Sequence, residues 1–78
     1  MKHTEETAMT KKIELKALLA DKYNIEESEI EDTTSVSTII GSDKNLGIHL
    51  NDKFGKQPSV KEEEGFSTFE DVLTWLDN

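Results

Sequence analysis

Cysteine and arginine are both missing from this chain. Without cysteine, neither a disulfide nor a thiolate zinc site can stabilise the fold. All nine basic residues are lysines, so no planar guanidinium is present to hold phosphates or base edges in a bidentate manner, which argues against nucleic acid as a partner. No apolar run approaches the ~18 residues of a membrane-spanning helix. The start of the chain is polar and unlike a signal peptide, so a cytoplasmic protein is expected.

Acidic residues dominate what is present. Seventeen aspartates and glutamates against nine lysines give a formal charge of -8 in 78 residues. This length allows one small domain, which buries roughly 60% of its unfolded surface and is therefore marginally stable. A negative surface argues against anionic membranes and favours fast association with protein partners that carry basic patches. We expect a monomer that binds neither nucleic acid nor a membrane.

Apolar residues at helical spacing begin after position 10. Residues 1–9 are polar and are expected to form a flexible lead, which leaves 10–78 as the folded domain. The spacing i, i+3, i+4, i+8 predicts a helix over 10–22. Thr10 is its expected N-cap and Asn24 its left-handed C-cap. The apolar face consists of Leu15, Leu18, Leu19 and Tyr23.

The middle of the chain combines a long connection with a weak helix. Residues 25–41 are predicted to form a long ordered loop, which aliphatic side chains anchor to the core. A strand over 36–40 is rejected because no second strand is available to pair with it. The second helix is expected over 43–54, capped by Ser42 or Asp43. Gly47 weakens this helix by about 1 kcal/mol relative to alanine.

The end of the chain carries the clearest helix. Pro58 and Ser59 are expected to start a single helical turn. The last helix is predicted over 67–77, with a capping box in which Ser67 and Glu70 cap each other's amides. The fold class is therefore an all-α bundle of three main helices with a short fourth and a long loop after the first. The expected core contains Leu15, Leu18, Leu19, Ile30, Val36, Ile48 or Leu50, Phe69, Val72, Leu73 and Leu76.

Three segments in this order resemble the acyl carrier protein family. Residues 18–25 (Leu-Leu-Ala-Asp-Lys-Tyr-Asn-Ile) are similar to the end of the family's first helix, and residues 25–36 to its long loop. Residues 66–76 (Phe-Ser-Thr-Phe-Glu-Asp-Val-Leu-Thr-Trp-Leu) are similar to its last helix. The resemblance covers about residues 11–77. It implies a small helical bundle that carries acyl groups on a serine-linked 4′-phosphopantetheine.

The attachment motif departs from the family pattern. The family reads Asp-Ser-Leu at the start of its second helix, whereas the matching residues here are Asp43, Lys44 and Asn45. Lysine cannot form the phosphodiester that joins a serine to 4′-phosphopantetheine. The family's second helix also recognises partners through several acidic residues, but here it carries His49 and Lys53 beside Asp52.

Ser42 is the nearest hydroxyl that could replace the missing serine. Its use requires a two-residue shift in the loop, and a helix N-terminus at this point would favour the attached phosphate. The alternative and favoured interpretation is that Ser42 simply caps the helix, as serine commonly does.

No nucleophile–base pair, carboxylate dyad or metal-ligand set stands out, so no enzyme and no metal are expected. Lys44 and Asn45 favour an interaction module that needs no cofactor and binds a protein partner through its acidic surface. The alternative is an acyl carrier that bears 4′-phosphopantetheine on Ser42 and holds acyl thioesters in fatty-acid, polyketide or related biosynthesis. A third interpretation is a purely structural acidic domain whose likeness to carriers is chance.

Overall fold

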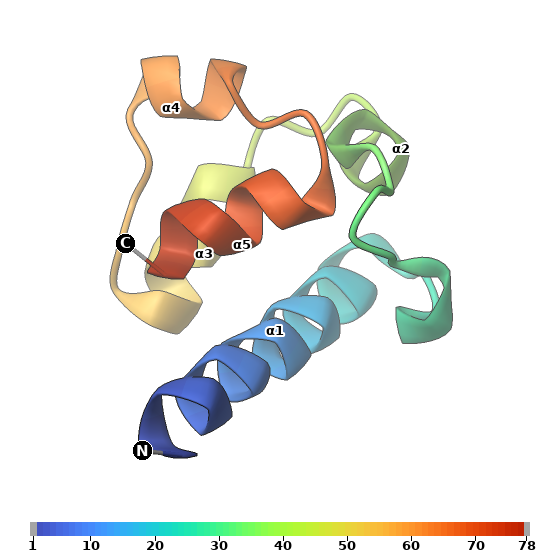
Figure 1. Ribbon diagram of the computed structural model, residues 1–78. Helices are drawn as coiled ribbons and strands as arrows, with labels where there is room; N and C mark the ends of the chain where they lie inside the picture. The colour runs from blue at the N-terminus through green and yellow to red at the C-terminus, as the bar shows by residue number, and fades with distance from the viewer. Residues whose placement is uncertain (1, 78) are drawn as a thin grey trace.

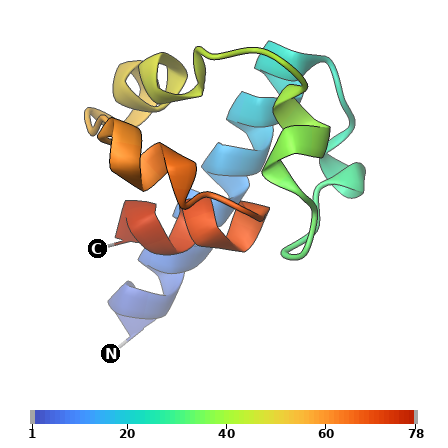
Figure 2. The same ribbon diagram turned by 90° about the horizontal axis from the view of Figure 1, so that it is seen from above.

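The computed structural model describes residues 2–77, with side chains described from Thr10 onward. The described residues form an all-α bundle without strands, as the sequence predicts (Figure 1). α1 packs against α5, α2 and η1. In both views η1 and α2 lie on one side of the molecule, and α3 and α4 lie on the other (Figure 2). The elements are α1 (Lys2–Tyr23), the 3₁₀ helix η1 (Glu27–Glu29), α2 (Val36–Ile40), α3 (Leu46–Phe54), α4 (Val60–Glu64) and α5 (Phe69–Asp77).

The first helix is longer than predicted. α1 begins at Lys2, so Thr10 is not its N-cap and the helix runs without a break across the expected boundary between the lead and the domain. Good helix formers and the absence of glycine and proline before Asn24 explain this extension. Met1 lies outside the described residues. The helix ends as predicted, because Asn24 adopts a left-handed conformation with φ 56°.

The connection between α1 and α3 contains more helix than expected. Val36–Ile40 forms α2, so the rejection of a strand is confirmed but the prediction of an irregular loop is wrong at this point. One helical turn places Val36 and Ile39 on the same side, and both are buried. The connection is also bound to the start of α5, because Val36 N donates to Ser67 O (2.9 Å) and Phe69 N donates to Thr34 O (2.8 Å).

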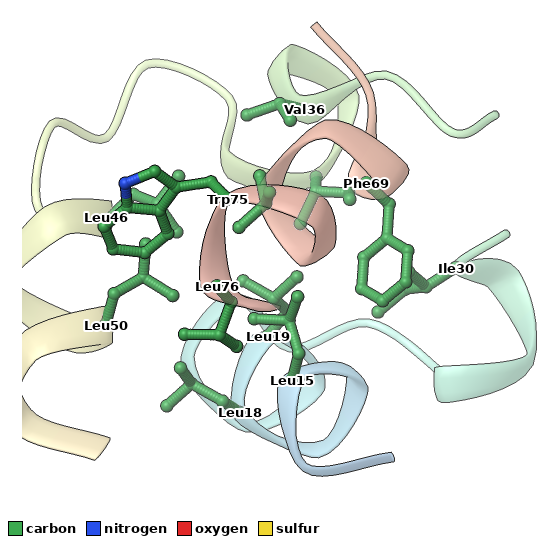
Figure 3. Close-up of a cluster of buried hydrophobic side chains, with 12 residues drawn as sticks. Leu15, Leu18, Leu19, Ile30, Val36, Leu46, Leu50, Phe69, Trp75 and Leu76 are labelled. Carbon is green, nitrogen blue, oxygen red and sulfur yellow. The ribbon is translucent and has the colours of Figure 1, made fainter. Parts of the chain in front are cut away.

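One hydrophobic core joins α1, α2, α3 and α5 (Figure 3). Most of the predicted core is confirmed, but Leu73 is only partly buried, and Trp75 is buried although it was not in the predicted core. Of the two alternatives that the sequence left open, Leu50 lies in the core, because Ile48 is 52% exposed on the opposite face of α3. The buried residues are Leu15, Leu18, Leu19, Ile30, Val36, Ile39, Leu46, Leu50, Phe69, Val72, Trp75 and Leu76.

The cap of α5 lies one residue later than predicted. Asp71, not Glu70, is the acidic partner: its Oδ2 accepts from Thr68 N (3.0 Å), while Asp71 N donates to Thr68 Oγ1 (3.4 Å). The amide of Glu70 is engaged elsewhere, because it donates to the carbonyl of Asp32 (3.1 Å). Ser67 therefore has no free Glu70 amide to cap, and the box shifts to the next pair.

α4 and the start of α3 lie against each other at Gly47. The short helix is confirmed, with Ser59 Oγ accepting from Glu62 N (3.1 Å) in a capping box. A Cβ at Gly47 would stand 2.7 Å from Glu63 Oε2 and 3.5 Å from Pro58 Cγ. The glycine that weakens α3 in isolation is therefore what lets Glu63 approach this helix.

Candidate functional site

The turn between α2 and α3 is where the sequence places the candidate attachment residues. α2 ends at Gly41, whose φ of 61° is readily available only to glycine among common residues. Gly41 N donates to Ser37 O (2.9 Å), and Asp43 N donates to Ile40 O (3.1 Å). These bonds reverse the chain, and α3 then begins at Leu46 with Asn45 as its N-cap. The predicted helix start at 43 is therefore wrong by about one turn.

Ser42 lies exposed in this turn. Its hydroxyl makes no hydrogen bond with any residue that the structure describes. The expected capping role is wrong, because Ser42 precedes the N-cap by three residues. The side chain is thus accessible, but it stands in the turn and not at the first turn of α3. An attached phosphate on Ser42 would lack the direct helix-terminus placement that the sequence suggested.

Asp43 fastens the turn to the end of α1. Its Oδ2 accepts from Tyr23 Oη (2.7 Å) and from Asn45 N (3.1 Å), and its Oδ1 accepts from Asn45 Nδ2 (3.2 Å). The hydrogen bond from Tyr23, followed by smaller contributions from the Asn45 amide and nearby His49, lowers the pKa of Asp43 despite partial desolvation. Asp43 caps no helix end, contrary to one sequence expectation, and instead organises the loop before α3.

Tyr23 and His49 complete this junction. Burial, and then the hydrogen bond to Asp43, raise the pKa of the Tyr23 phenol, so it remains a neutral donor. The His49 ring meets the Tyr23 ring edge to face, with centroids 5.8 Å apart. The sequence could not reveal this cluster, because Tyr23 and Asp43 are twenty positions apart.

Lys44 occupies the position that the resemblance assigns to the prosthetic serine. Its side chain is exposed and lines a hollow of about 540 Å³ between the turn and α4. The other lining residues are Asp43, Val60, Glu63 and Glu64. Val60, which is 75% exposed, is not among the residues predicted from the sequence to form a site. A signal was available, since no apolar residue follows Val60 at i+3 or i+4 to share a buried face.

The described residues offer little else for chemistry. Within 2–77, no group of three or more histidine, aspartate or glutamate side chains is arranged to hold a metal ion. Among the described helices, none is both long and apolar enough to cross a membrane. A second hollow of about 330 Å³ lies between α4 and α5 beside Phe66 and Trp75. These rings contact each other edge to face, and Lys56 covers the Trp75 ring at 4.6 Å from its centroid.

The chain matches no protein-family model, no curated protein and no solved structure.

We predict that the hydrogen bond between Tyr23 and Asp43 stabilises the fold at neutral pH and that acid removes this stabilisation. A carboxyl whose pKa is lowered by folding stabilises the fold above its unfolded value, 3.8 for aspartate, and this contribution is lost as the pH falls through the folded value. Tyr23→Phe keeps the ring but removes the donor. In urea titrations it should therefore destabilise the protein at neutral pH, and by a smaller amount well below pH ~3.8. A difference that stays constant from neutral to strongly acidic pH would contradict the charged hydrogen bond.

Proposed function

We propose that this chain is a non-carrier interaction module with a carrier-protein-like arrangement of helices. The observation that carries the proposal is the exposed Lys44 directly after Asp43, in the turn where a carrier would present its serine. An amine at this position cannot receive a phosphopantetheine phosphodiester. The module needs no cofactor, and its role is to bind another protein.

The fold supports this proposal in its general form. A long first helix, a connection anchored in the core, and three further helices agree with what the resemblance implies. Asp43 fastens the turn before α3 by hydrogen bonds from Tyr23 and the Asn45 amide, although Lys44 stands at the position of the carrier serine. An ordered turn that lacks the prosthetic serine is what we expect of a module that binds a protein partner but carries no acyl group.

The partner class follows from charge. The chain carries a formal charge of -8, so complementary basic patches on another protein would speed association. We place this protein in the cytoplasm as a monomer, outside the classes of enzymes, nucleic-acid binders and membrane binders.

One observation favours the alternative of a working carrier. Ser42 is exposed and its hydroxyl is not engaged by the described residues, so a transferase could reach it. Under this alternative, Ser42 would hold 4′-phosphopantetheine, whose thiol forms acyl thioesters.

Incubation with coenzyme A and a broad-specificity phosphopantetheinyl transferase separates the two functions. We expect the intact mass to remain unchanged, while a known carrier protein in the same reaction is modified. A mass gain of one phosphopantetheine group that disappears in Ser42→Ala would overturn the proposal and establish Ser42 as the attachment residue.

A further inference from the structure

The hollow between the turn and α4 combines features that suit one kind of ligand group. Its wall contains three carboxylates, on Asp43, Glu63 and Glu64, against the single ammonium of Lys44. It also contains Val60, which is 75% exposed. An aliphatic surface beside carboxylates matches a long side chain with an apolar stem and a cationic end.

Among the side chains that the structure describes, neither Glu63 nor Glu64 forms an ion pair. The ion pairs of the described residues are Lys11 with Asp77 and Lys12 with Asp32, and neither involves the hollow. Glu63 can lie against α3 because Gly47 has no side chain. A Cβ atom added at Gly47 would stand only 2.7 Å from Glu63 Oε2. The Glu63 carboxylate stands at the wall of the hollow, and no described lysine forms an ion pair with it.

Asp43 supplies a fixed part of the same wall. Its position is set by the bond from Tyr23 (2.7 Å) and by the Asn45 amide (3.1 Å). A carboxylate that is already oriented loses little freedom when a ligand arrives, which favours binding. A planar guanidinium can also bond two carboxylate oxygens at once, which an ammonium cannot do with the same geometry.

We propose that this hollow binds an arginine side chain from a partner protein, with the stem along Val60 and the guanidinium toward Glu63 and Glu64. The inference rests on the proposed function and specifies its partner: a segment in which aliphatic residues flank an arginine. Lys44 opposes this ligand by charge and limits its affinity.

The test is an NMR titration of the ¹⁵N-labelled full chain with the peptide acetyl-Ala-Leu-Arg-Leu-Ala-amide. We expect amide shifts concentrated at Lys44, Val60, Glu63 and Glu64. The matched peptide with citrulline, which keeps the shape but not the charge of arginine, should bind at least roughly threefold more weakly, in keeping with the loss of exposed ion pairs. Equal binding of both peptides, or no localised shifts, would overturn the proposal.

Two pairs of glutamate substitutions that change the net charge equally show whether the peptide binds in the hollow. Glu63→Gln with Glu64→Gln should weaken binding roughly threefold or more, whereas Lys44→Gln should strengthen it. The control pair, Glu27→Gln with Glu31→Gln, changes the net charge identically at exposed positions in and beside η1, and it should leave binding unchanged. Equal weakening by both pairs would mean diffuse attraction to an acidic surface and would overturn the proposal.

The titration and the transferase reaction can fail separately. An unmodified protein without localised peptide binding would remove the arginine site but leave a module that binds elsewhere. A protein that accepts the arm on Ser42 would remove the non-carrier function, whatever the titration shows.

Discussion

Phe69→Ala should lower the free energy of unfolding by about 3–5 kcal/mol, the usual range for a buried phenylalanine. Phe69 is 0% exposed at the first position of α5. Its ring belongs to the same buried core as Ile30 (Figure 3), so the substitution weakens the packing of the long connection and the last helix around this core. A domain of this length has a total stability of roughly 4–12 kcal/mol. The variant should therefore lose at least a quarter of its free energy of unfolding, and it should be unfolded where the loss is largest and the total is smallest.

Urea denaturation followed by the fluorescence of Trp75, the single tryptophan, measures this loss. Leu73→Ala is the matched control: it lies one turn later on the same helix, and its side chain is only partly buried. Both substitutions introduce alanine into α5, so differences in helix propensity are small beside the packing term. An equal cost for both variants would contradict the assignment of Phe69 to the centre of the core.

Local periodicity accounts for the parts of the fold that the sequence predicts well. α5 presents apolar residues at i, i+3, i+4 and i+7, and the helix appears within two residues of its predicted start. The left-handed Asn24 ends α1 as predicted, and α3 ends at its predicted last residue, Phe54, before the left-handed Gly55. These features depend on neighbours a few positions away, which a sequence displays directly.

Long-range contacts decide what periodicity misses. α2 has five residues, too few for a helical pattern, and it forms where Val36 and Ile39 reach the core. The α5 cap shifts because a carbonyl from Asp32 takes the Glu70 amide. Nothing in the local sequence encodes that competition.

In the candidate site, too, some features are visible in the local sequence and others depend on long-range contacts. The departure at Lys44 is visible in the sequence, and its exposure follows from a polar turn. The restraint on that turn is not visible, because Tyr23 must first be brought to Asp43 by the packing of α1. Gly47 likewise looks like a simple weakness in α3 until Glu63 is placed against it.

Restoring the carrier motif should convert the protein from unmodified to modified. We expect Lys44→Ser with Asn45→Leu, in a Ser42→Ala background, to gain one phosphopantetheine group from coenzyme A and a broad-specificity transferase. Lys44 and Asn45 are both exposed, so neither substitution disturbs the core. The Asn45 side chain makes no capping hydrogen bond to α3. Its replacement removes the 3.2 Å bond from Asn45 Nδ2 to Asp43 Oδ1 but keeps the 3.1 Å bond from the backbone amide of residue 45 to Asp43 Oδ2.

Two controls give this result its meaning. Lys44→Ala with Asn45→Leu in the same background should remain unmodified, because the hydroxyl is the only difference from the restored motif. Adding Tyr23→Phe should reduce the rate of modification, since the turn then loses the 2.7 Å bond that holds Asp43. If the restored variant folds like the parent by circular dichroism yet gains no mass, the likeness to carrier proteins does not extend to the turn that a transferase recognises. A modified variant would instead mean that the residues at positions 44 and 45 separate this fold from carriage, because every other element needed to present the arm would be present in the chain.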